Sequence, residues 1–71
     1  MEVVKALQKF GYSVVHQKGS HIKLSKVYPS EKHIIVVPRH KELDLGTLRS
    51  IVKRLGKYIS EEDFLKELTG H

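Results

Sequence analysis

The dipeptide Gly19-Ser20, which lies between two short apolar runs, is the feature that most limits what this chain can fold into. Glycine tolerates the positive φ that a type II′ turn requires at its first central position, so Gly-Ser is a common centre for a two-residue hairpin. Such a turn pairs residues 12–17 with residues 21–26 as antiparallel strands. We therefore expect a tight β-hairpin in the first third of the chain.

The register of this hairpin decides which side chains share a face. Lys18 and His21 are expected to face each other next to the turn, and His16 to face Lys23 on the same side of the sheet. The apolar side chains then point to the opposite side, toward whatever covers the sheet: Val15, Ile22 and Leu24. One face is thus predicted to be apolar, and the other to be basic with two histidines.

Three further segments flank the hairpin. Residues 1–10 carry apolar side chains at the spacing of one helical face, and Gly11 fits the left-handed position that ends a helix. Residues 27–31 contain Pro29 and are expected to form a connecting loop. Residues 32–37 are rich in β-branched side chains and predict a third strand, whose unbroken apolar run favours a central or doubly covered position.

The rest of the chain favours two helices after Pro38, which ends the third strand. Asp44 can cap the first helix and Gly56 can end it. Its apolar residues repeat at i, i+3, i+4 and i+7: Leu48, Ile51, Val52 and Leu55. Ser60, followed by three acidic residues, begins a short last helix that we expect to dock on the sheet or on its predecessor.

This order of elements predicts the α+β class. We expect residues 1–71 to form a single small α-β-β-β-α(-α) domain with a three-stranded antiparallel sheet and helices on one face. Domains of this architecture include the double-stranded RNA-binding fold. A shared architecture does not by itself assign a function.

Size and charge narrow the kinds of partner. The chain has 71 residues. A domain of this size buries only about 60% of the surface of its unfolded chain, which leaves no room for a deep enclosed site and favours a polymer as substrate. Thirteen Lys and Arg residues against eight Asp and Glu residues give a formal net charge of +5. This charge favours an anionic partner, with nucleic acid ahead of a membrane.

The composition also excludes several kinds of chemistry. The absence of cysteine excludes disulfides, a zinc ribbon and a cysteine nucleophile. The five histidines show no metal-ligand spacing, so we expect neither a metal site nor another cofactor. The first ten residues mix charged with apolar side chains, unlike a signal peptide, and no apolar run approaches the length of a membrane span. A cytoplasmic protein without a membrane partner is therefore expected.

Several short motifs together cover nearly the whole chain: Gly11-Tyr12, Lys18-Gly19-Ser20-His21, Val36-Val37-Pro38 with His40, Lys41-Glu42-Leu43 and Gly46-Thr47-Leu48-Arg49-Ser50-Ile51. In this combination the chain resembles the HicA family of small toxins, which are messenger-RNA interferases. The resemblance implies a fold similar to the double-stranded RNA-binding domain, metal-free cleavage of RNA and neutralisation by a HicB-type antitoxin. The catalytic histidine of that family falls on His21.

The residue chemistry agrees with such a reaction. Metal-free RNA cleavage uses the 2′-hydroxyl of the strand as nucleophile, so the protein must supply a base, and His21 is our candidate. His16 is a candidate for the second acid only if the hairpin register holds. DNA lacks the 2′-hydroxyl, so RNA alone is expected as substrate.

Cleavage also needs groups that stabilise the charge on phosphorus. Lysine and arginine side chains can bind phosphate, and backbone N–H groups at a glycine turn can approach it closely. The residues that we expect to bind RNA are Lys18, Gly19, Ser20, Lys23, Arg39 and Arg49.

Two other functions stay open at this point. One is a non-catalytic RNA-binding module of double-stranded RNA-binding-domain-like fold, which the charge favours and the scarcity of aromatic stacking residues disfavours. The other is a protein-interaction domain whose basic face docks an acidic partner, in which case His21 would have no catalytic role.

Overall fold

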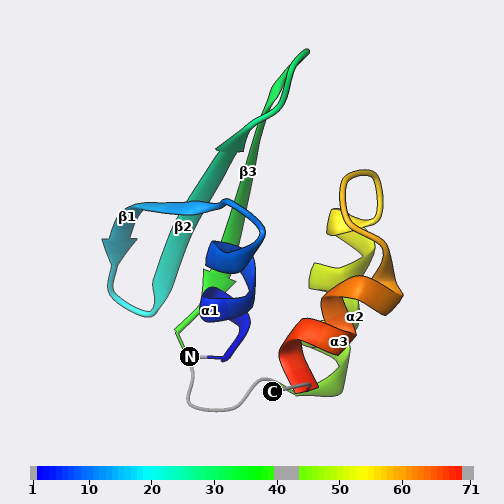
Figure 1. Ribbon diagram of the computed structural model, residues 1–71. Helices are drawn as coiled ribbons and strands as arrows, with labels where there is room; N and C mark the ends of the chain where they lie inside the picture. The colour runs from blue at the N-terminus through cyan, green and yellow to red at the C-terminus, as the bar shows by residue number, and fades with distance from the viewer. Residues whose placement is uncertain (1, 40–43, 70–71) are drawn as a thin grey trace.

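The computed structural model describes residues 2–39 and 44–69 and confirms the predicted α+β class. His40 and residues 41–43, which contributed to the family resemblance, lie outside the described residues. In Figure 1 the strands lie side by side, the N-terminal helix lies beside the sheet, and the helices of the C-terminal part lie next to each other. In chain order the elements are α1 (Glu2–Lys9), β1 (Ser13–Lys18), β2 (His21–Val27), β3 (Lys32–Pro38), α2 (Leu45–Leu55) and α3 (Glu61–Thr69).

The predicted hairpin register is confirmed next to the turn. The three strands form one antiparallel sheet in the order β1-β2-β3. Lys18 pairs with His21, and His16 pairs with Lys23. The φ angle of Gly19 is positive, at 57°. A positive φ is expected for the residue that starts a tight hairpin turn.

The register changes further along β1, and the prediction for Val15 is wrong. Val14 pairs with Leu24 while His16 pairs with Lys23, so Val15 is the extra residue of a β-bulge. A bulge breaks the alternation of side chains along the strand, and Val15 is 51% exposed. The predictions for Ile22 and Leu24, which pack against the helices, are confirmed.

The predicted position of β3 is also wrong, because β2 is the central strand and β3 is an edge strand. The two sides of β3 differ in burial. Ile35 and Val37 are buried under the helices, whereas Ile34 is 49% and Val36 is 38% exposed on the other side. The helices therefore cover one face of the sheet and leave most of the other face open.

The core lies between the covered face of the sheet and all three helices. Its buried residues are Val3, Ala6, Leu7, Tyr12, Ile22, Leu24, Ile35, Val37, Ile51, Val52, Leu55, Ile59 and Phe64. Helix α3 contacts both α1 and α2. The Phe10 and Phe64 ring centroids lie 6.3 Å apart, and Lys9 forms a 2.8 Å salt bridge with Glu67. Helix α3 thus docks on α2, which was one of the two expectations, and also on α1.

The predicted helix boundaries follow from local chemistry. The Asp44 carboxylate accepts a 2.6 Å hydrogen bond from the Thr47 N–H at the start of α2, and the Ser60 hydroxyl accepts one of 3.1 Å from the Asp63 N–H at the start of α3. Gly11 also has a positive φ, which allows the chain to turn from α1 into β1. Caps of this kind depend on residues close in sequence, so they could be predicted.

An aromatic cluster joins the far end of the sheet to the connection between α2 and α3. The Tyr12 hydroxyl lies 2.7 Å from His33 Nδ1 and 3.1 Å from the Tyr28 hydroxyl. Tyr28 stacks on Tyr58 with ring centroids 4.2 Å apart. Tyr12 is almost fully buried, and burial raises its pKa well above the usual range of tyrosine. No local pattern in the sequence indicates this cluster.

The His33 ring in this cluster predicts a pH dependence of stability. Burial lowers the pKa of His33, and the nearby Lys57 acts in the same direction while Glu31 opposes both. The unfolded chain therefore binds more protons than the folded chain as the pH falls below about 6.5. We expect the free energy of unfolding to decrease from pH 7.5 to pH 5.5 and to be nearly constant above pH 7.

Urea denaturation at several pH values measures this effect. The His33→Gln variant should lose part of the decrease between pH 7.5 and pH 5.5, whatever its stability at pH 7.5. His16→Gln, which changes an exposed histidine, is the control and should keep the wild-type slope. An identical slope in both variants would contradict the assignment to His33.

Candidate active site at the end of the first hairpin

His21 is the first residue of β2 and is exposed on the open face of the sheet. It pairs with Lys18 on β1 and with Pro38 on β3, so it lies between the two neighbouring strands. Its Nδ1 atom is 3.5 Å from the Ser20 hydroxyl, at the limit of a hydrogen bond. The imidazole is thus open to a large substrate and is only weakly constrained by its neighbours.

Most of the predicted site residues lie around this histidine. Lys18 faces it across the hairpin, Lys23 follows it on the same face of β2, and both lysines are exposed. The Arg39 N–H donates a hydrogen bond to the Ser20 carbonyl oxygen, which holds the chain after β3 against the hairpin turn. The turn residues and Arg39 therefore belong to one contiguous surface with His21.

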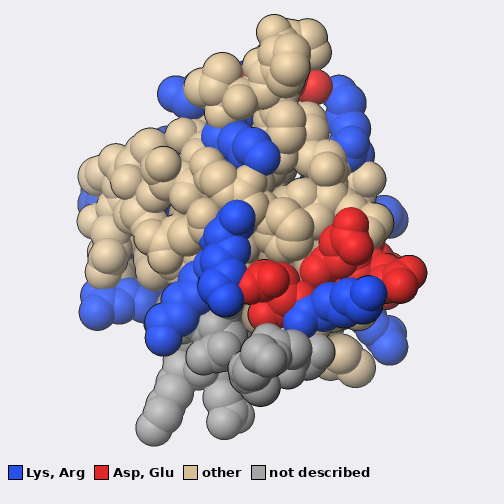
Figure 2. Space-filling model, in the orientation of Figure 1, with Lys and Arg blue, Asp and Glu red and all other residues tan. Residues whose placement is uncertain are grey.

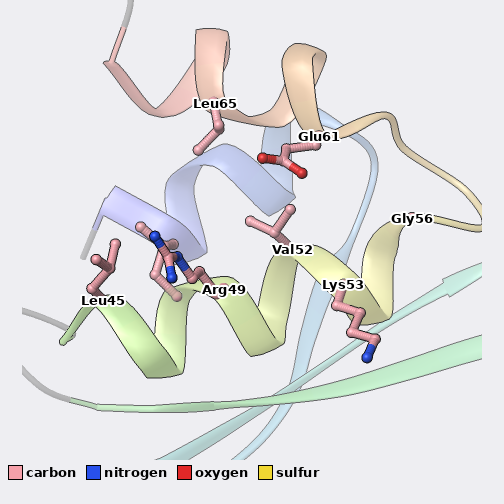
Figure 3. A pocket seen from close by; sticks show the side chains of 8 residues that line it. Leu45, Arg49, Val52, Lys53, Gly56, Glu61 and Leu65 are labelled. Carbon is pink, nitrogen blue, oxygen red and sulfur yellow. The ribbon is translucent and has the colours of Figure 1, made fainter.

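Arg49 is the exception among the predicted residues. It lies on α2 and lines a hollow between α2 and α3, whose lining also includes Lys53 and Leu65 (Figure 3). This hollow does not include His21 among its lining residues. The structure therefore separates Arg49 from the surface on which the other predicted residues gather.

A different face of α2 lies next to His21. A hollow of about 450 Å³ is lined there by His21, Val36, Pro38, Gly46, Thr47, Ser50, Ile51 and Arg54. Thr47, Ser50 and Arg54 are not among the site residues that the sequence predicts. Their spacing of i, i+3 and i+7 places them on one side of the helix. This polar stripe is the sequence pattern from which a site on this side could have been predicted. Nothing in the sequence indicated that this stripe would lie near His21.

The charges are unevenly distributed over the molecule. Helix α3 carries four of the eight acidic residues, and acidic side chains gather in one area at the lower right of Figure 2. The hairpin with His21 carries only basic and neutral residues. A polyanion is therefore expected to approach the hairpin rather than α3.

Two negative findings concern the residues that the structure describes. Within residues 2–39 and 44–69, no group of three or more His, Cys, Asp or Glu side chains could hold a metal ion. None of the helices in these segments is long and apolar enough to cross a membrane.

Comparison with known protein families gives a match over most of the chain. A family model described as the HicA toxin of bacterial toxin-antitoxin systems matches residues 1–57. No curated protein and no solved structure matches the chain. The matched residues include α1, the whole sheet and α2, and they end before α3.

Proposed function

Because the chain belongs to the HicA family, the toxins of bacterial toxin-antitoxin systems, we propose that it is a metal-independent endoribonuclease that cleaves messenger RNA. One observation carries this proposal: the exposed His21 lies on the open face of the sheet between Lys18 and Lys23. A base next to two cations on an accessible surface is what cleavage of an RNA strand requires.

In the proposed reaction, His21 removes the proton from a ribose 2′-hydroxyl. The resulting oxygen forms a bond to the adjacent phosphorus, and the bond from phosphorus to the 5′-oxygen breaks. The products are a 2′,3′-cyclic phosphate and a 5′-hydroxyl, whose oxygen must receive a proton. His16 is our candidate donor, because its pairing with Lys23 places it on the same face of the sheet as His21.

Binding of the phosphate at the cleavage site is the second requirement. We propose that Lys18, Lys23 and Arg39 bind this phosphate and the phosphates next to it in the strand. The N–H groups of Gly19 and Ser20 would approach it at the turn. The exposed positions of these residues around His21 support this role. Arg49 is proposed to contact RNA only outside the active site, because it lines the hollow on the other side of α2.

The proposal is tested by incubating the purified chain with an end-labelled RNA in the presence of EDTA. We expect fragments with 5′-hydroxyl and 2′,3′-cyclic phosphate ends, and no cleavage of DNA of the same sequence. Fragments with 5′-phosphate ends would contradict the mechanism. RNA that is bound but stays intact would favour the non-catalytic RNA-binding module instead.

Membership in the family implies a cognate antitoxin. We propose a HicB-type protein that places carboxylates against the cations around His21 and so excludes RNA. Lys18→Glu is expected to weaken binding of both RNA and antitoxin by about tenfold or more, because it turns an attraction into a repulsion at both interfaces.

Binding of both partners can be measured by titration, with the antitoxin taken from the neighbouring gene. Lys5→Glu, the same charge change at an exposed position on α1, is the matched control and should affect both partners much less. His21→Ala should keep antitoxin binding. A ternary complex that forms with full affinity for both partners would show that inhibition acts at another surface.

A further inference from the structure

The hollow beside His21 has two chemically different walls. The wall from the sheet consists of the His21 imidazole with the apolar side chains of Val36 and Pro38. The wall from α2 includes two hydroxyls and a guanidinium, which belong to Thr47, Ser50 and Arg54. An apolar wall opposite a polar, cationic one is suited to a ligand that has a flat apolar body and an anionic group.

We propose that this hollow binds one unpaired nucleotide of the RNA next to the scissile bond, with Arg54 holding its phosphate. The inference rests on the proposed function, which it deepens by identifying where the substrate strand lies beyond His21. The hollow has a volume of about 450 Å³. This volume is at the low end of the range for small-molecule sites and suits a single nucleotide. A base that is paired within a duplex cannot enter it.

The electrostatics of the hollow favour a phosphate at Arg54. Among the described lining residues, Arg54 is the one lysine or arginine, and none is acidic. The side chain is exposed and belongs to neither of the two salt bridges found among the described residues, Lys9–Glu67 and Lys57–Glu31. Its guanidinium is therefore available for a bidentate contact with phosphate.

The two hydroxyls give the hollow a second role. The Thr47 N–H already donates to Asp44, but no hydrogen bond of the described residues occupies the hydroxyl of Thr47 or of Ser50. A hydroxyl can donate and accept, so either group can contact a base edge. Contacts to base edges carry sequence information, whereas contacts to phosphate do not. Ser50 is thus expected to influence which nucleotide is accepted.

The sharpest test compares Arg54→Gln with Lys53→Gln. Both variants remove one exposed positive charge from the same helix, but Lys53 lines the hollow on the other side of α2. The probe is a trinucleotide with 2′-deoxyribose at its first and second positions, so that neither of its two phosphodiesters has the adjacent 2′-hydroxyl that cleavage needs. We expect Arg54→Gln to weaken binding of this probe by about tenfold and Lys53→Gln to change it less than about twofold. Equal affinities of the two variants would overturn the inference.

Two further measurements use the same probe and a duplex. Amide NMR shifts of Thr47, Ser50 and Arg54 should move on addition of the trinucleotide, and the absence of such shifts in a protein that binds the probe would overturn the inference. A longer, stable RNA duplex that contains the same three nucleotides should bind with no dependence on Arg54. An equal dependence on Arg54 in duplex and single strand would also overturn it.

Cleavage of a mixed-sequence RNA separates the two roles within the hollow. Arg54→Gln should slow cleavage at all sites alike, whereas Ser50→Ala should change the relative rates among sites. If the wild-type chain does not cleave RNA at all, the proposed function fails, yet the trinucleotide titrations still decide the inference. If His21→Ala abolishes cleavage while Arg54→Gln behaves like Lys53→Gln, the inference fails and the function stands.

Discussion

Replacing His21 with alanine is expected to lower the rate of RNA cleavage by about a hundredfold or more, the usual contribution of a general base. The fold and the affinity for RNA should stay nearly unchanged. The side chain is exposed, so the substitution removes no core packing, and the lysines that are proposed to bind phosphate remain in place. The effect should therefore be on the chemical step rather than on binding.

Three measurements on the same protein sample check this expectation: cleavage of a labelled RNA, affinity for that RNA and thermal unfolding. An RNA with a single 2′-deoxyribose at the cleavage site is the substrate control. The wild-type chain should fail to cleave this RNA, just as the His21→Ala variant should fail to cleave the unmodified RNA. Undiminished cleavage by His21→Ala would exclude this residue as the base. Loss of cleavage together with a normal unfolding curve would support it.

The second large effect is expected in the core, at Phe64 on α3. This side chain is fully buried and packs against Phe10. Phe64→Ala should therefore lower the free energy of unfolding by about 3–5 kcal/mol, because it leaves a cavity among core residues. A domain this small is expected near the low end of the usual range of unfolding free energies, at about 5 kcal/mol. The variant should therefore unfold at a much lower denaturant concentration than the wild type.

Urea denaturation of Phe64→Ala and of Glu62→Ala, an exposed position on the same helix, tests this expectation. The control should differ from the wild type by less than about 0.5 kcal/mol. The comparison also tests how much α3 contributes to the stability of the rest of the chain, because α3 lies outside the residues matched by the family model. A loss of less than about 1 kcal/mol in Phe64→Ala would mean that the family portion of the chain folds largely without α3.

Much of the fold could be predicted from the sequence because its causes are local. The Gly19 turn determined the pairing of Lys18 with His21, since a two-residue loop leaves the adjacent residues no other register. The caps at Asp44 and Ser60 act through hydrogen bonds to the N–H groups three residues later. The exposure of His21 follows from the same hairpin, whose alternation points Ile22 into the core.

Other features depended on residues far apart in sequence. The bulge at Val15 and the edge position of β3 depend on how the strands pair and on how the helices pack against one face of the sheet. The aromatic cluster joins Tyr12, His33 and Tyr58, which no local pattern connects. Apolar periodicity indicates which face of a helix is buried, but it does not indicate what lies beside the polar flanks of that helix.

The candidate site illustrates the same division. The sequence by itself identified His21 and the cations of the hairpin, because turn chemistry and strand alternation place them on one face. Only the tertiary structure decided which side of α2 lies next to this face. Arg49 and Arg54 are five residues apart and so point in clearly different directions from a helix. Packing of the buried face against the sheet directs them to different hollows. The orientation of α2 is set by its long-range contacts, and for this reason Arg54 could be assigned to the site only from the fold.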